Sequence, residues 1–130
     1  MGLDMYLYGV IDEFNKHEYN IGHERKQIEI GYWRKANQIH NWFVENIQDG
    51  IDNCATYVVF RENLEELKSL CEEIVVNQEK AEELLPVRSG FFFGSTEYDE
   101  FYMHNIQNTL EIIDYALKSD YDFFVYSSSW

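Results

Sequence analysis

One histidine and two cysteines are the residues of this chain best suited to hold a metal ion. His40, Cys54 and Cys71 offer an imidazole and two thiolates, the ligands of many tetrahedral zinc sites, and the carboxylate of Asp4 would complete the shell. His40 and Cys71 each fall on or beside the apolar stripe of a predicted helix, where a polar or soft side chain needs a partner. No Cys-x-x-Cys or His-x-x-x-His spacing accompanies them. Zinc is therefore one hypothesis, and a buried thiol beside a core histidine is the other.

The common sequence signatures of catalysis are missing. The chain has no Gly-x-Ser-x-Gly elbow, no phosphate-binding loop and no His-Glu-x-x-His motif. A small metal-dependent, hydrolase-like enzyme stays open as an alternative function. In it, His40 and a cysteine or Asp4 would hold the metal, and a metal-bound water would be the nucleophile.

Negative charge is the strongest pattern in the sequence. The net charge is −14, and residues 1–40 carry six acids against five bases, so nearly all of the excess lies after His40. Such a surface repels phosphate backbones, which disfavours direct binding to nucleic acid. It attracts a basic protein surface, including a groove that normally holds nucleic acid.

The acids form two clusters that we predict to be partner contacts. The candidate contact residues are Glu62, Glu65, Glu66, Glu72, Glu73, Glu82, Glu83, Glu97, Asp99 and Glu100. A solvated outer face that keeps the protein in solution is the simpler interpretation of the first cluster. The second cluster opens a predicted helix, where the helix dipole favours acids.

Composition indicates one folded domain of 130 residues, because 45% of them are apolar and 17% aromatic. No apolar run reaches the roughly 18 residues of a membrane span. The first ten residues carry Asp4 and lack a basic stretch, so they predict a strand instead of a signal peptide. Two cysteines are too few for a secreted disulfide framework, and we expect a reducing cytoplasm.

Apolar alternation and helical spacing divide the chain into eight elements. Strands are predicted over 3–10, 27–33, 55–60 and 121–126, and helices over 34–48, 62–76, 78–85 and 98–117. Residues 12–26 are predicted to be a loop, and residues 89–96 a loop or a short buried strand. The expected fold is α+β: a mainly antiparallel sheet of three or four strands, with three or four helices packed on one face.

Five short stretches resemble a family of small phage and prophage proteins. They are GLDMY at 2–6, YWRKAN at 32–37, IHNW at 39–42, SGFFFG at 89–94 and YSSSW at 126–130, in the same order over nearly the whole chain. The resemblance implies a phage context, with Asp4, Trp33, Arg34, His40 and Trp42 as shared site or core positions. Members are often labelled phosphoglycerate kinase, but this chain is too short for that two-domain enzyme and has no nucleotide-binding loop.

A small acidic phage protein is similar in type to the anti-CRISPR inhibitors of RNA-guided nucleases. Those nucleases hold guide and target in a positively charged channel. The expected function is therefore a phage counter-defence protein that binds a basic surface of a CRISPR effector nuclease and blocks target DNA loading or cleavage. Some inhibitors of this type are metalloproteins, so zinc is compatible with this function. A regulatory binding module for another host protein is a third possibility.

Overall fold

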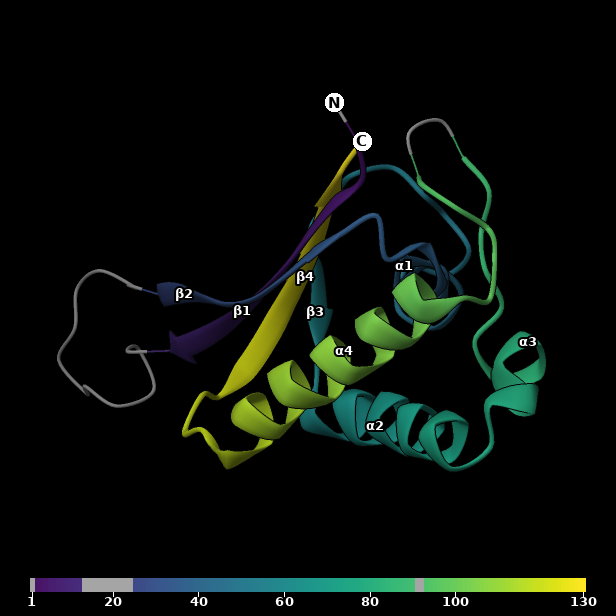
Figure 1. Ribbon diagram of the computed structural model, residues 1–130. Helices are drawn as coiled ribbons and strands as arrows, with labels where there is room; N and C mark the ends of the chain where they lie inside the picture. Colours follow the sequence, from purple (N-terminus) through teal and green to yellow (C-terminus); the bar gives the residue numbers. More distant parts are fainter. Residues whose placement is uncertain (1, 13–24, 91–92) are drawn as a thin grey trace, which may run out of the picture.

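Four strands form one antiparallel sheet at the centre of the molecule. The computed structural model describes residues 2–12, 25–90 and 93–130, so most of the loop predicted over 12–26 lies outside the described residues. The strands are β1 (Asp4–Asp12), β2 (Arg25–Arg34), β3 (Tyr57–Val59) and β4 (Phe123–Ser129), in the order β2-β1-β4-β3 (Figure 1). Every neighbouring pair is antiparallel.

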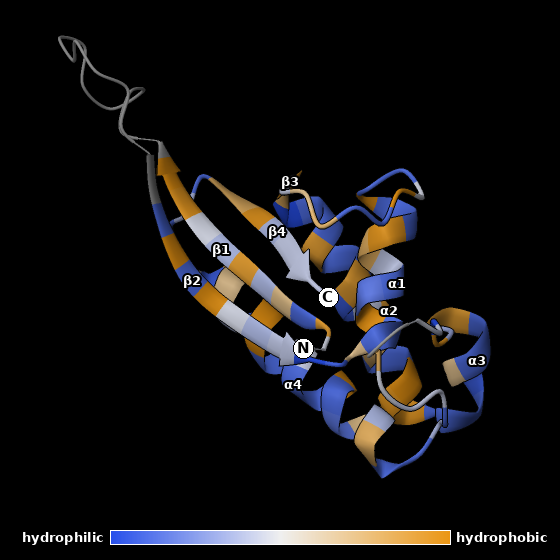
Figure 2. Cartoon of the chain, turned by 90° about the horizontal axis from the view of Figure 1, so that it is seen from above, coloured by the Kyte–Doolittle hydropathy of each residue, from blue (hydrophilic) through white to orange (hydrophobic). Residues whose placement is uncertain are grey.

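The helices lie on one face of this sheet (Figures 1 and 2). They are α1 (Asn37–Asn46), α2 (Arg61–Val76), the 3₁₀ turn η2 (Gln78–Lys80), α3 (Ala81–Leu84) and α4 (Glu100–Lys118). The α+β prediction is therefore confirmed. In the part of the chain that the structure describes, no helix is both long and apolar enough to span a bilayer.

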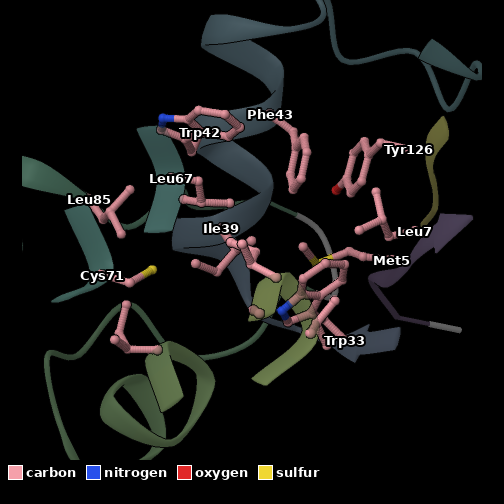
Figure 3. Close-up of a cluster of buried hydrophobic side chains, with 14 of the residues drawn as sticks. Met5, Leu7, Trp33, Ile39, Trp42, Phe43, Leu67, Cys71, Leu85 and Tyr126 are labelled. Atoms are coloured by element: carbon pink, nitrogen blue, oxygen red, sulfur yellow. The ribbon is translucent and has the colours of Figure 1, made fainter. Parts of the chain in front are cut away.

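Strand alternation decides which side chains enter the core. On β1, Met5 and Leu7 are fully buried, and on β4 Phe124 and Tyr126 are buried on the same face, with Tyr126 opposite Leu7. Successive strand residues point to opposite sides, so the intervening positions, such as Val125, face away from the helices. The core therefore lies between the sheet and the helical layer, as Figure 3 shows around Tyr126.

Two contacts fix β2 against α4. A Cβ at Gly31 would lie 2.5 Å from Cγ2 of Ile112, so only glycine lets the strand come this close to the helix. Two residues further on, the buried indole of Trp33 donates a hydrogen bond from Nε1 to Oγ1 of Thr109, 2.8 Å away. The edge strand is thereby held by packing and by a satisfied buried polar pair.

Helical spacing predicts an inward face of α4 made of Phe101, Ile106, Leu110, Ile113 and Leu117. Ile106 and Ile113 are fully buried, but 58% of the surface of Phe101 is exposed, and Tyr102 is buried instead. The hydroxyl of Tyr102 donates to the carbonyl oxygens of Ala81 and Leu85, so the buried phenol keeps a partner. Over residues 89–96, the described positions form a loop and no strand.

Candidate functional site

His40 sits at the centre of a buried hydrogen-bonded chain. Its Nδ1 lies 2.6 Å from the hydroxyl of Tyr126, and its Nε2 lies 2.9 Å from Oδ1 of Asp52. Burial lowers the pKa of His40 against the opposing effect of Asp52, and burial raises the pKa of Tyr126 well above its ordinary value. Because His40 is neutral and Tyr126 is protonated, the hydroxyl of Tyr126 donates to Nδ1 of His40, and the Nε2–H group of His40 donates to Asp52.

Asp52 joins this chain to a surface pocket. Its Oδ1 also accepts a hydrogen bond from Nε1 of Trp130 at 3.0 Å, and its Oδ2 lies 3.6 Å from Nε of Arg88. Arg88 in turn donates from Nη1 to Oδ1 of Asn41 at 3.0 Å and lies 3.6 Å from Glu45. One carboxylate therefore connects β4, α1 and the segment that follows α3.

Helix α1 holds that segment in place through a second asparagine. Asn37 is buried, and its Nδ2 donates to the backbone oxygens of Phe93 and Ser95. Its Oδ1 accepts from the backbone N–H of Arg88. Because Asn37 and Asn41 are one helical turn apart, both contact Arg88. The polar positions of α1 thus position a loop as well as the histidine.

The pocket beside Asp52 has a volume of about 310 Å³. Its lining residues come from three separate parts of the chain: Asp52, Arg88, Ser89, Gly90, Phe93 and Trp130. The rings of Phe93 and Trp130 meet edge to face with centroids 6.1 Å apart, and the ring of His40 packs against Phe93 at 5.5 Å. The pocket therefore combines an aromatic wall with one acid and one base.

The four predicted zinc ligands do not come together. Cys71 is in the core on α2 (Figure 3), whereas Cys54 is exposed in the loop before β3. Asp4 lies on β1, and both ring nitrogens of His40 already have partners. Among the described residues, no three His, Cys, Asp or Glu side chains are grouped so as to hold a metal ion. The predicted four-residue shell is thus not formed there, and zinc binding itself stays a prediction.

Two of these side chains have clear structural roles instead. Burial raises the pKa of Cys71 to about 12, so its thiol is protonated and packs as a small apolar group. Asp4 accepts hydrogen bonds from the hydroxyl of Tyr32 and from Nη1 of Arg34. The bond from Tyr32 and then the guanidinium of Arg34 lower the pKa of this carboxyl, in spite of some desolvation.

The ten predicted contact carboxylates are all exposed. They lie on α2, on α3, and at the start of α4 or in the loop just before it, so Glu82 and Glu83 belong to a different helix from Glu73. Among the described residues, Glu73 alone of the ten forms a salt bridge, with Lys80 at 2.9 Å. Asp99 caps α4 by accepting from two backbone N–H groups. We call these ten carboxylates the acidic surface.

No protein-family model, no curated protein and no solved structure matches this chain. The resemblance to small phage and prophage proteins therefore stays a prediction from the sequence motifs. Three of those motif stretches meet at the pocket, through His40 beneath it, Ser89 and Gly90 in its lining, and Trp130 in its wall.

Sequence reasoning missed Asp52 and Arg88. Asp52 lies in a loop with no periodic pattern, and only folding places it beside His40. Arg88 had a weak signal, since it is the single base between Lys80 and Lys118 in an acidic stretch. A single base in an acidic stretch is a candidate for an ion pair, because many carboxylates are available to it.

Proposed function

We propose that this protein is a phage counter-defence protein of the anti-CRISPR type. It binds a basic surface of an RNA-guided CRISPR effector nuclease and blocks target DNA loading or cleavage. The observation that carries the proposal is the acidic surface. Its ten carboxylates are exposed, and among the described residues nine of them have no basic partner within salt-bridge distance.

Unpaired carboxylates favour a basic partner in two ways. They keep their full charge for the encounter, so they steer a basic surface toward the helical layer. They also need no rearrangement of internal ion pairs when they meet lysine or arginine side chains of the partner. A channel that holds a nucleic-acid backbone presents such side chains in rows.

Helix α2, which carries five of these ten carboxylates, is held in place by its buried face. Leu64, Leu67, Cys71 and Ile74 bury the inner face of α2, while Glu65 and Glu72 lie on its exposed side. At the start of the helix, Oδ1 of Asn63 accepts a hydrogen bond from the backbone N–H of Phe60. Carboxylates on a fixed scaffold lose less conformational entropy on binding than carboxylates on a loose segment.

Charge reversal on α2 tests the proposal. A guide-loaded nuclease is titrated with the protein in the presence of labelled target DNA, and displacement of the DNA is measured at several salt concentrations. We expect wild type to compete with the DNA. The double variant Glu65→Lys/Glu66→Lys should compete at least about tenfold less well and should show a weaker dependence on salt.

A second double variant changes the net charge equally at other places. Glu29 on β2 and Asp120 after α4 are both exposed and lie outside the acidic surface. Glu29→Lys/Asp120→Lys should therefore compete within about threefold of wild type. Equal losses in both variants would mean that total charge matters and α2 makes no specific contact. No competition by wild type would reject this class of partner.

A further inference from the structure

The carboxylate of Asp52 has one oxygen that accepts two hydrogen bonds and one that forms only an ion pair with Arg88. Oδ1 accepts hydrogen bonds from His40 and from Trp130. Oδ2 accepts no hydrogen bond from the described residues, because its nearest base, Nε of Arg88, is 3.6 Å away. The side chain is only 12% exposed, and Asp52 lines the pocket. A carboxylate oxygen in this position favours a ligand that donates a hydrogen bond.

Arg88 presents a matching set of donors. Its Nη1 donates to Asn41, but its Nε and Nη2 groups have no acceptor within hydrogen-bond distance among the described residues. The guanidinium is planar, and its Nε–H and Nη2–H point from one edge, which suits the two oxygens of a carboxylate. The side chain is 30% exposed and also lines the pocket.

The charges of these two groups decide what kind of ligand fits. A purely cationic ligand would satisfy Asp52 but would lie against the guanidinium of Arg88. A purely anionic ligand would satisfy Arg88 but would lie against Asp52 and near Glu45, in a chain of net charge −14. A ligand that carries an ammonium and a carboxylate side by side satisfies both, with charge-assisted hydrogen bonds to each.

The remaining walls favour an apolar group on that ligand. Trp130 is 48% exposed, and its ring is held in place through Nε1 by Asp52. The ring of Phe93 lies beside Trp130 and against Gly90. A Cβ at Gly90 would lie 2.6 Å from the Phe93 ring, so the glycine leaves room for this ring. The volume of about 310 Å³ is at the small end of the range for ligand pockets, roughly 300–1,000 Å³.

We propose that this pocket binds a free α-amino acid with an apolar or aromatic side chain. The ammonium group donates to Oδ2 of Asp52, and the carboxylate accepts from the Nε–H and Nη2–H edge of Arg88. The side chain packs on Trp130 and Phe93. This binding site is separate from the acidic surface, so a test of amino-acid binding does not decide the proposed function, and the reverse also holds.

A titration with matched small molecules tests the ligand class. The probes are L-phenylalanine, 2-phenylethylamine, which lacks the carboxylate, and 3-phenylpropionate, which lacks the ammonium. Binding is followed by the NMR shift of the Trp130 indole N–H, assigned with Trp130→Phe. We expect L-phenylalanine to bind at least about tenfold more tightly than either analogue. Equal binding of all three, or no binding of L-phenylalanine at millimolar concentration, would overturn the proposal.

Two conservative variants test the two polar groups. Asp52→Asn keeps an oxygen for His40 and Trp130 and replaces only Oδ2, whereas Arg88→Lys keeps the positive charge and removes the two-donor edge. Each should weaken L-phenylalanine binding at least about tenfold. Asp114→Asn, the same change on α4 outside the pocket lining, should leave it unchanged.

Thermal unfolding shows whether each variant is folded. If Asp52→Asn does not fold, Arg88→Lys decides the question by itself, since its side chain is partly exposed and its backbone contact with Asn37 is kept. Wild-type affinity in a folded variant of either residue would exclude the proposed pairing with that group.

Discussion

Burial decides what His40 does in this protein. An exposed histidine would titrate near its ordinary pKa of 6.5, but His40 is fully buried and burial lowers its pKa. Both nitrogens have partners in Tyr126 and Asp52, so the neutral ring is satisfied. The residue that looked most like a metal ligand in the sequence is therefore a hydrogen-bonded connection between α1, β4 and the pocket.

The free energy of unfolding should fall as the pH drops below about 6.5. The folded state holds His40 neutral because its pKa is lowered, whereas the unfolded chain takes up a proton there. The unfolded state therefore binds more protons, and stability is lost as the pH falls through the unfolded pKa. The loss is at most about 1.4 kcal/mol per pH unit. Urea unfolding between pH 7.5 and 5.5 measures it.

His40→Gln isolates this contribution from the other titrating groups. The variant should be less stable than wild type at pH 7.5 by about 1–3 kcal/mol, because Tyr126 and Asp52 lose well-placed partners. This difference in the free energy of unfolding should narrow toward pH 5.5, because only wild type has a buried neutral His40 that takes up a proton on unfolding. His104→Gln, at an exposed histidine, should follow wild type in parallel. A difference in stability that stays constant or widens would show that folding does not lower the pKa of His40.

At the scale of elements, Arg61 ties the start of α2 to the end of α4. Its guanidinium donates to the carbonyl oxygens of Ala116, Leu117, Ser119 and Tyr121. Ala116 and Leu117 are among the last four residues of α4, whose carbonyls have no partner in the regular helical pattern, whereas Ser119 and Tyr121 follow the helix. The oxygen of Ala116 also accepts from the backbone N–H of Ser119. The same guanidinium lies 5.5 Å from the ring centroid of Phe124.

Arg61→Ala should therefore destabilise the protein by about 2–4 kcal/mol, because several charge-assisted hydrogen bonds are lost at once. Arg61→Lys should lose a smaller amount, since one ammonium cannot reach all four carbonyls. Urea unfolding measures both. Lys118→Ala, at an exposed base of the same helix end, should change stability by less than about 1 kcal/mol. Similar losses for Arg61→Ala and Lys118→Ala would show that the four bonds are dispensable.

The elements were predictable where one periodicity holds over many residues. The alternation in β1 and the stripe of Leu64, Leu67, Cys71 and Ile74 in α2 fix the element and its buried face together. Phe101 was misassigned because α4 begins with aromatic residues at adjacent positions, and capping by Asp99 decides which one turns inward. The pocket was not predictable, because Asp52 comes from a loop and meets Arg88 only after folding.

Across the whole molecule, the acidic surface and the outer face of the sheet are separate surfaces. The acidic surface stands on the helical layer, whereas the outer face of the sheet carries Tyr6 and Tyr32, with ring centroids 5.4 Å apart, and the Asp4–Arg34 ion pair. The sequence indicated the position of the negative charge along the chain. The negative charge falls on one layer because the helices lie together on one face of the sheet (Figure 2).

Carboxylates concentrated on one layer repel each other, so the acidic surface should cost stability. On α2, Glu62 and Glu66 are four residues apart, a spacing at which like charges destabilise a helix by about 0.2–0.5 kcal/mol per pair. Glu65→Lys/Glu66→Lys should therefore raise the melting temperature at low salt. Added sodium chloride should stabilise wild type more than this variant, since salt weakens repulsion between exposed charges, with a Debye length of about 10 Å at 0.1 M.

Glu29→Lys/Asp120→Lys is the matched control, because it changes the net charge equally away from α2. It should gain less stability at low salt than the α2 variant. Equal gains would mean that the repulsion is spread over the whole surface, and a loss of stability in the α2 variant would mean that its carboxylates support the fold. A larger gain on α2, together with weaker competition for the nuclease, would mean that the chain keeps a destabilising surface for the sake of binding.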